Sequence, residues 1–295
     1  MFSYRHAFHA GNHADVLKHM VLVATLQHLT QKEAALTVLD THAGAGLYRL
    51  DSEFAHTSGE AAQGIERLLS LPTADLAPAI QNYVEVVRTF NRCAGVKVYP
   101  GSPFIAQHLL RPHDRLKLFE LHPTDQRLLG GNIAQLEAGR QVSVAAEDGF
   151  EAIKKFLPPP SRRALVLCDP SYEIKSDYHR VPALLQEALQ RFATGCYAIW
   201  YPIIARPEAH DLPRRLKAQA VKAGKAWLHA SLTVKGGQMQ RSDDGVMRPS
   251  GLPASAMFLI NPPYPLQPAL QEALPQLVKL LGQDQHATFT LQAGQ

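Results

Sequence analysis

Apolar residues recur along the chain at two spacings, and these predict where helices and strands lie. Residues 14–29 carry apolar side chains at helical spacing, and Asn12 is placed to cap the start of that helix. Residues 51–96 are also predicted to be mainly helical. Short apolar runs bounded by polar or glycine-containing segments predict strands. The predicted strands cover 36–40, 115–120, 142–146, 163–169, 196–201, 230–234, 256–260 and 287–291.

Strands and helices alternate in this pattern, which is typical of an α/β protein with a doubly wound, mostly parallel sheet. Right-handed connections place the carboxyl ends of parallel strands along one edge, and ligands bind at that edge. Acidic residues stand at or just after four successive strand ends: Asp40, Glu120, Asp148 and Asp169. Because a buried strand end does not need a carboxylate, the pattern predicts a ligand site there.

A turn with two glycines, residues 40–46, follows the first predicted strand. It lacks the third glycine of the GxGxxG turn that holds a dinucleotide pyrophosphate. S-adenosylmethionine has no phosphate and needs acceptors for its amino group and ribose hydroxyls. Asp40 and His42 beside Gly44 suit that need, and a purely structural turn is the alternative.

Two further strand ends extend the predicted cofactor site. Glu120 can accept both ribose hydroxyls, and Asp148, followed by Gly149, can accept from the adenine amine of the cofactor. Taken singly, each acid could instead cap a loop. Together with the glycine turn they favour a nucleoside-containing cofactor.

The segment Asp169-Pro170-Ser171-Tyr172 predicts the chemistry. An amino group on an aromatic ring is a poor nucleophile because its lone pair is delocalised. The Asp169 carboxylate and the Pro170 carbonyl can accept its two hydrogens, and proline fixes the turn. Tyr172 is expected to stack on the base. The segment is close to the Asp/Asn/Ser-Pro-Pro-aromatic pattern of amino-group methyltransferases and departs from it at Ser171.

A second segment, Asn261-Pro-Pro-Tyr264, fits that pattern without a departure. It follows a late strand, after the acidic residues have already filled the ligand edge. The position next to the transferred methyl belongs to the fourth core strand, so we expect Asp169 rather than Asn261 to act.

Composition and charge limit the class of protein. The chain has 295 residues, 46% hydrophobic and 19% charged, so it should bury a core. The three cysteines are odd in number and far apart, which predicts a reduced, cytoplasmic protein without a disulfide framework or a zinc knuckle. Apolar runs are too short to span a membrane. The net charge of +4 and clusters at 154–155, 162–163, 214–217 and 222–225 permit nucleic-acid binding.

The first nineteen residues are unusually rich in histidine. A metal site is one interpretation, with His9, His13, Asp15 and His19 as ligands. The segment lacks an HExxH motif, and Gly11 would interrupt a helix between His9 and His13. Contact with RNA and cofactor is a second interpretation, and a capped amphipathic helix with a polar tail is a third.

Motifs spread over almost the whole chain give a close resemblance to a known family. They are YRHAFHAGNHADVLKH at the start, LDTHAGAG, YPGSP at 99–103, ELHP at 120–123, the 148–150 turn, DPSYE and YPI near Trp200. In these the chain resembles the bacterial RlmJ family, the 23S ribosomal RNA adenine-N6 methyltransferases.

The resemblance implies a class I, Rossmann-like methyltransferase fold. Residues 1–52 and 99–295 would form the methyltransferase domain, and 53–98 a helical insertion after the first core strand. It also implies that Tyr4 and His6 approach the target base, together with Lys18. The residues implied to line the cofactor and target pocket are Lys18, His19, His42, Ser102, Glu120, Asp148, Gly149 and Asp169.

The resulting expectation is methyl transfer from S-adenosylmethionine to N6 of an adenine in 23S ribosomal RNA, without a metal. S-adenosylhomocysteine is the other product. The substrate is expected to be naked or precursor RNA with the adenine unpaired or flipped out, and the enzyme a cytoplasmic monomer without membrane contact. The alternatives are a protein glutamine N-methyltransferase, a metal-dependent hydrolase using the N-terminal histidines, and a non-catalytic RNA-binding protein with a decayed site.

Overall fold

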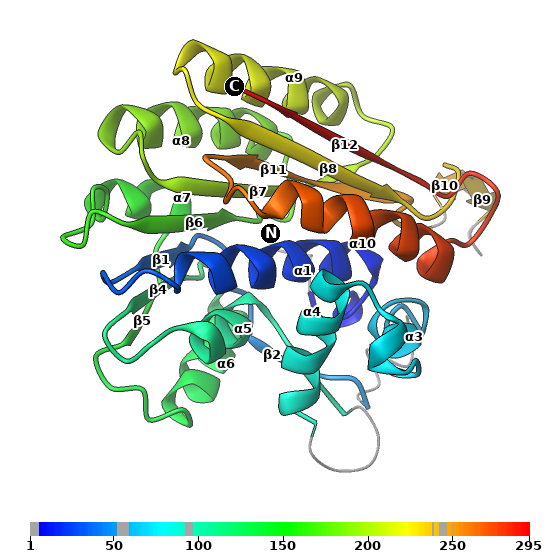
Figure 1. The fold of residues 1–295 in the computed structure, drawn as a ribbon, viewed down its shortest axis with the longest axis horizontal. Coiled ribbons are helices and arrows are strands. Elements are labelled where there is room, and N and C mark those ends of the chain that lie inside the picture. The colour runs from blue at the N-terminus through cyan, green and yellow to red at the C-terminus, as the bar shows by residue number, and fades with distance from the viewer. Residues whose placement is uncertain (1–5, 52–58, 92–96, 238, 242–246, 250) are drawn as a thin grey trace.

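The computed structural model describes residues 6–51, 59–91, 97–237, 239–241, 247–249 and 251–295. Its centre is an eight-stranded sheet in the order β12-β8-β11-β7-β6-β1-β4-β5 (Figure 1). The parallel strands are β1 (Thr37–Asp40), β4 (Arg115–Phe119), β5 (Val142–Ala145), β6 (Ala164–Cys168) and β7 (Cys196–Ile203). The remaining strands are β8 (Trp227–Thr233), β11 (Ala254–Ile260) and β12 (Thr288–Gly294).

This sheet confirms the predicted doubly wound, mostly parallel topology. Strand β11 runs antiparallel to both β7 and β8, and β12 runs antiparallel to β8. Two short pairs were not predicted: β2 (Leu47–Arg49) with β3 (Val98–Pro100), and β9 (Met239–Arg241) with β10 (Met247–Pro249). Strands of three residues are too short to show a periodic pattern.

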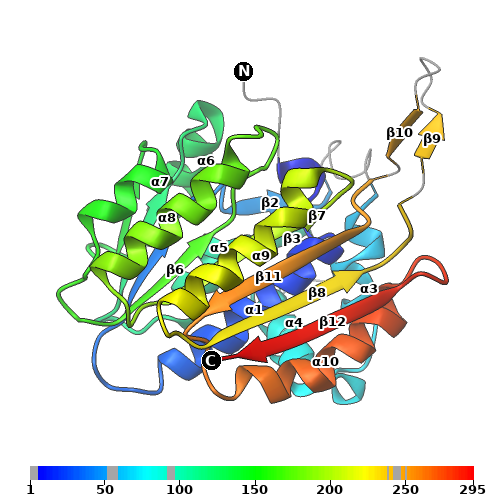
Figure 2. The same cartoon turned by 90° about the horizontal axis from the view of Figure 1, so that it is seen from above.

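Helices cover both faces of the sheet (Figure 2). Helices α1 (His13–Leu29), α4 (Pro78–Thr89), α5 (Ser102–Leu109) and α10 (Leu266–Leu281) pack together on one face. Helices α7 (Gly149–Ala152), α8 (Asp177–Arg191) and α9 (Pro207–Lys222) lie on the other. The chain also forms α3 (Ile65–Leu69), α6 (Pro123–Ala134) and short 3₁₀ turns at His6–Phe8, Ala61–Gln63, Thr73–Asp75 and Ile153–Lys155.

Among the described helices, none has the length and apolar character needed to cross a bilayer.

Helix α1 begins as predicted, because the Asn12 side chain accepts hydrogen bonds from the backbone amides of Ala14 and Asp15, each at 2.9 Å. The predicted single apolar face is wrong, however. Polar residues such as Lys18 and His19 are buried along with the apolar ones. The reason is that α4 and α10 cover the side of α1 that faces away from the sheet.

The described part of the predicted insertion, 53–98, lies between β2 and β3 and contains α3 and α4. Its buried side chains, among them Ile65, Leu68 and Ile80, belong to the same hydrophobic cluster as the strands. The insertion therefore extends the main core and, through α4, supplies part of the outer cover of α1, which α10 completes.

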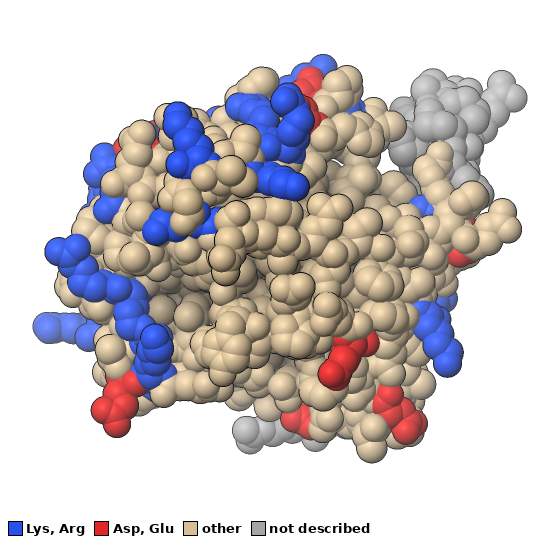
Figure 3. All heavy atoms as spheres, turned by 45° about the horizontal axis from the view of Figure 1, so that its top comes forward, with Lys and Arg blue, Asp and Glu red and all other residues tan. Residues whose placement is uncertain are grey.

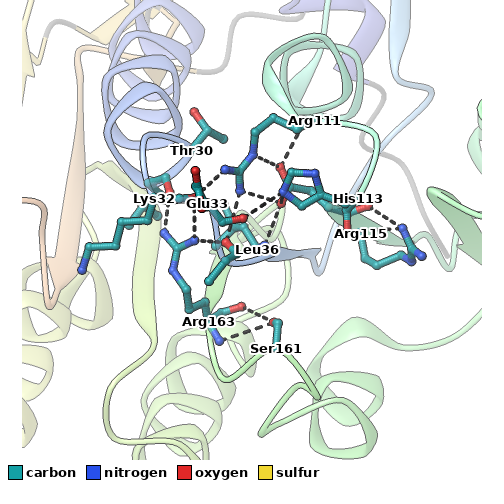
Figure 4. A network of polar contacts seen from close by, with 12 residues as sticks. Thr30, Lys32, Glu33, Leu36, Arg111, His113, Arg115, Ser161 and Arg163 are labelled. Atoms are coloured by element: carbon teal, nitrogen blue, oxygen red, sulfur yellow. Dashed lines mark hydrogen bonds and ion pairs between the residues drawn. The ribbon is translucent and has the colours of Figure 1, made fainter.

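A polar network stabilises the edge of the sheet opposite the carboxyl strand ends (Figure 4). Asp114 is fully buried and accepts hydrogen bonds from the backbone amides of Leu36 at 2.7 Å and Arg111 at 2.9 Å. The Arg111 guanidinium also donates to Asp114, with its Nε and Nη2 both at 2.9 Å. Arg111 and Arg163 further donate to backbone carbonyls of the loop that follows α1, including that of Lys32.

We expect Asp114→Ala to lower the free energy of unfolding by roughly 3 kcal/mol, because it leaves Arg111 and the Leu36 amide without their buried acceptor. Urea denaturation measures this loss. Asp211→Ala is the control, since Asp211 pairs with Arg214 at the surface and should leave the midpoint nearly unchanged. Equal midpoints for both variants would contradict the assignment.

Candidate active site

A cavity of about 510 Å³ opens at the carboxyl ends of β1, β4, β5 and β6. Its size suits a nucleoside-containing ligand. Twelve of the residues that the sequence singles out lie on its wall: His6, Lys18, His19, His42, Gly44, Ser102, Glu120, Asp148, Gly149, Asp169, Pro170 and Tyr172. Tyr4 lies outside the described residues.

Glu120 and the glycine turn form one part of the wall. The backbone amide of Gly44 donates to Glu120 Oε2 at 2.8 Å, and that of His122 donates to Oε1 at 2.7 Å. Burial raises the pKa of Glu120, whereas the two amides act in the opposite direction. Gly44 has φ +60°, and a Cβ there would lie 2.3 Å from the Tyr48 hydroxyl oxygen, so the turn requires glycine.

Asp148 and Gly149 form a second part. Asp148 caps α7 by accepting from the Phe150 amide at 3.0 Å, and its other oxygen accepts from Arg180 at 2.5 Å. A Cβ on Gly149 would lie 2.0 Å from the Thr41 carbonyl oxygen, so only glycine lets this turn approach the one after β1. Arg180 lies with its guanidinium carbon 4.1 Å from the Phe150 ring centroid. No pattern in the sequence indicated Arg180, because α8 reaches this site only in the folded chain.

His42 lies between these two parts. Its Nδ1 is 2.7 Å from the Thr41 hydroxyl, and its ring meets Phe150 edge-on. Burial lowers the pKa of His42 to about 4, so the ring is neutral at pH 7.

Asp40 does not line the cavity, which corrects the expectation that it contacts the cofactor. It is only 2% exposed and lies beneath the turn. Its oxygens accept from the Ser102 hydroxyl at 2.7 Å and the His42 amide at 3.3 Å. Burial raises the pKa of Asp40 to about 7. Ser102 lines the cavity, and Asp40 lies on the side of Ser102 that faces away from the cavity, within hydrogen-bonding distance of its hydroxyl.

Asp169 belongs to a buried charge network that the sequence did not reveal. Its Oδ2 lies 2.6 Å from Lys18 Nζ, and Lys18 Nζ lies 2.8 Å from Asp15 Oδ1. Asp15 Oδ2 is 2.9 Å from His6 Nε2. Burial raises the pKa of Asp169, and Lys18 opposes that rise. For Asp15, burial is outweighed by His6 and Lys18, which hold its pKa well below the usual range.

His19 connects the cavity wall to the insertion. Its Nδ1 is 2.6 Å from the Tyr99 hydroxyl, which lies 2.9 Å from the Tyr83 hydroxyl on α4. Burial lowers the pKa of His19 to about 3, so it is neutral at physiological pH. His19 directly follows Lys18 on α1, and both residues line the cavity.

Tyr172 is placed differently from its predicted stacking role. The residue is 2% exposed, and its hydroxyl donates to the Trp200 carbonyl at 2.8 Å. Its ring centroid lies 4.8 Å from that of Tyr178 and 6.2 Å from that of Trp200. Stacking of Tyr172 on a base does not fit this arrangement, because neighbouring rings already cover it. Trp200 also lines the cavity, with Lys18 Nζ 5.5 Å from its ring centroid.

The backbone of the Asp169 motif is held from β7 and its following loop. Arg206 donates to the Tyr172 carbonyl at 3.1 Å, and Tyr172 adopts φ +55°. Pro170 is buried, whereas Ser171 is exposed on the cavity rim. The residue that departs from the usual motif therefore lies at the solvent side of the turn.

The competing motif lies at the opposite edge of the sheet. Because β11 is antiparallel to β7, Asn261 follows its end beside the start of β7. The Asn261 amide donates to the carbonyls of Ala193 at 3.0 Å and Gly195 at 2.7 Å. Tyr264 is 84% exposed there. Asn261 is occupied in holding a loop and is absent from the cavity wall.

The N-terminal histidines contact separate partners. His9 Nδ1 is 3.0 Å from Glu60, to which Asn12 also donates at 2.9 Å, and His13 Nε2 is 2.9 Å from the Leu252 carbonyl. Within the described ranges, no group of three or more His, Cys, Asp or Glu side chains is arranged to hold a metal ion.

Known proteins resemble this chain over nearly its whole length. It is 42% identical to "Ribosomal RNA large subunit methyltransferase J" of Escherichia coli K12, covering 94% of this chain and 93% of that protein. The protein of the same name from Haemophilus influenzae is 41% identical, with 99% and 98% covered. A crystal structure of a Legionella pneumophila protein is 30% identical and superposes with a TM-score of 0.81, covering 97% of this chain and 98% of that one.

The fold is thus the class I, Rossmann-like methyltransferase fold that the sequence predicted. The family model described as "Ribosomal RNA large subunit methyltransferase D, RlmJ" matches residues 33–292. Membership of a methyltransferase family implies the use of S-adenosylmethionine. On the strength of that match and of the two full-length relatives, the chain belongs to the RlmJ family of ribosomal RNA large subunit methyltransferases.

Proposed function

We propose that the protein transfers a methyl group from S-adenosylmethionine to the exocyclic N6 of an adenine in 23S ribosomal RNA. The observation that carries this proposal is the position of Asp169 and Pro170 on the wall of the cavity that Glu120 and Asp148 also line. Amine acceptors and candidate cofactor ligands therefore meet in one space.

The residues present fit the cofactor. Glu120 is oriented by two backbone amides and retains lone pairs for the ribose hydroxyls. Asp148 can accept from the adenine amine at the far side of the cavity. When bound, S-adenosylmethionine supplies an electrophilic methyl group on a positively charged sulfur. His42 and Gly149 line the same cavity.

The Asp169 turn is suited to activate an aromatic amine. The carboxylate and the Pro170 carbonyl can accept the two N6 hydrogens, which orients the nitrogen lone pair toward the incoming methyl. The nitrogen becomes positively charged as the new bond forms and then loses one proton. Trp200 is 9% exposed and Tyr172 is 2% exposed, so Trp200 offers the more accessible aromatic ring on the cavity wall.

Charge and the named relatives favour ribosomal RNA as the substrate. Between residues 175 and 225 there are nine Lys and Arg against four Asp and Glu. Figure 3, which turns the α8 and α9 side forward, shows Lys and Arg gathered over the upper and left parts of that face. Such a surface suits phosphates. The relatives' names do not favour a protein glutamine substrate or a site without activity.

The remaining features of the reaction are part of the same proposal. N6 lies on the Watson–Crick edge, so the adenine must be unpaired or flipped out. Naked or precursor RNA offers such a base more readily than an assembled particle. We propose a cytoplasmic monomer in which residues 53–98 form the insertion and His6 and Lys18 lie beside the base.

Asp169→Ala should reduce methylation of RNA by at least about 100-fold, because it removes the charged acceptor for N6. Asn261→Ala is the matched control in the competing motif and should leave the rate within about twofold. Labelled S-adenosylmethionine and RNA from cells lacking the enzyme provide the assay, with the label mapped to a base. Loss of activity in the Asn261 variant alone would contradict the assignment.

Glu120→Gln should weaken binding of S-adenosylmethionine by about tenfold, since a neutral amide is a poorer acceptor for two ribose hydroxyls. Isothermal titration calorimetry measures the dissociation constant. Glu147→Gln is the control, because Glu147 pairs with Lys155 at the surface near the same edge. Unchanged affinity in the Glu120 variant would exclude the ribose contact.

Asp40 should make the protein less stable as the pH rises from about 4 to 7. The unfolded chain releases the Asp40 proton near pH 3.8, whereas the folded chain keeps it until about pH 7. Deprotonation therefore favours the unfolded state throughout that window, by on the order of 4 kcal/mol in total. Denaturation midpoints measured across the window should fall less steeply for Asp40→Asn. Parallel curves for the variant and the natural protein would show that Asp40 is ionised in the fold.

A further inference from the structure

One lysine ammonium lies between two carboxylates in the interior beside the acceptor site. Lys18 is 4% exposed and Asp15 is 1% exposed, and the Asp169 side chain is 14% exposed. The contacts are 2.8 Å from Lys18 Nζ to Asp15 and 2.6 Å to Asp169. The three formal charges sum to −1, so Lys18 neutralises only one of its two partners.

The other contacts of Asp15 come from the N-terminal segment. Asp15 Oδ2 accepts from the Gly11 amide at 2.9 Å and lies 2.9 Å from His6 Nε2. His6 adds a charge only when it is protonated. Asp40 is a further buried carboxyl nearby, and the charge of Asp169 helps to raise the pKa of Asp40. Water cannot screen these charges well, because Asp15 and Lys18 are buried on a helix that is covered all round.

The chemistry of the proposed reaction makes this excess charge useful. The bond from sulfur to methyl breaks with its electron pair going to sulfur, and the N6 lone pair forms the new bond to carbon. One positive charge therefore moves from sulfur to N6, and N6 then releases one proton to water. A site with a net negative charge favours a cation at this place, whereas an isolated Lys18–Asp169 pair would be neutral.

We propose that Asp15 is a positioning residue that shares the Lys18 ammonium and so keeps the acceptor site negatively charged for methyl transfer. The inference rests on the proposed function, because it assumes that Asp169 faces the reacting amine. Asp15 acts through Lys18 and does not touch the substrate. Its position three residues before Lys18 on α1 places both side chains on one side of the helix.

A purely structural role is the competing explanation, since Asp15 also holds the Gly11 amide and lies in the first turn of α1. Asp114 provides a matched control for it. Asp114 is also fully buried and pairs with Arg111 three residues away at 2.9 Å, but it lies outside the cavity. If only the loss of a buried carboxylate mattered, substitutions at both positions should change stability and binding alike. A change in the charge of the acceptor site is expected only for substitutions of Asp15.

The test compares two cofactor analogues by calorimetry at pH 8, where an ordinary histidine is neutral. S-adenosylhomocysteine has an uncharged sulfur, and sinefungin carries a protonated amine in place of the methyl sulfonium. In Asp15→Asn the preference for sinefungin over S-adenosylhomocysteine should fall about tenfold, with binding of the neutral analogue within twofold. The kcat for RNA should fall roughly tenfold to a hundredfold with little change in KM. Asp15→Glu should restore the preference, and Asp114→Asn should keep it while losing stability.

An unchanged preference in folded Asp15→Asn would overturn the proposal, and so would an equal loss of affinity for both analogues. If the Asn variant does not fold, Asp15→Ser and Asp15→Glu provide the test through the same ratio of affinities for sinefungin and S-adenosylhomocysteine. Only the glutamate variant should keep the ratio of the natural protein. A failure of the proposed function is recognised separately. In that case the natural protein does not methylate RNA, or Asp169→Ala keeps full activity.

Discussion

The ammonium group of Lys18 is the interaction on which the arrangement of the active site depends. It lies in the interior between Asp15, on its own helix, and Asp169, at the end of β6. A buried charge is stable only when partners replace the water that it has lost, so the carboxylates fix the ammonium and are fixed by it. Helix α1 is thereby joined to β6, the strand that precedes the turn of Asp169 and Pro170. Removing Lys18 would leave two carboxylates facing each other in a medium that screens poorly, whereas removing either carboxylate would leave one neutral pair.

Three aspartates near the carboxyl ends of parallel strands differ in role because their neighbours differ. Asp40 lies under the turn and receives hydrogen bonds from a hydroxyl and an amide, so burial dominates and raises its pKa to about 7. The Asp148 side chain is 31% exposed and is paired with Arg180. Asp169 is next to a lysine that counteracts its burial. The same type of side chain therefore supports a turn, pairs with an arginine or pairs with a buried lysine, depending on what the fold brings beside it.

The helices between β2 and β3 contribute to the site as well as to the core. Tyr83 on α4 contacts Tyr99, which in turn contacts His19 on the cavity wall. Glu60, just before the first turn of this segment, contacts His9 and Asn12 at the start of α1. Because the same helices cover the outer side of α1, they make the burial of its charged residues possible. The excess negative charge inferred for the acceptor site depends on that cover.

The sequence by itself determined the strands, the edge at which ligands bind and the acidic ends such as Glu120 and Asp169, because periodicity and right-handed crossovers are local and topological rules. Its motifs also identified the family. Only the tertiary structure decided which side chains reach the cavity. The strand direction of β11 removed Asn261 from the site, and rings from β7 and α8 covered Tyr172. The role proposed for Asp15 depends on Asp169, 154 positions away, which shares the Lys18 ammonium with it, because burial and charge balance depend on contacts between segments that are far apart in the chain.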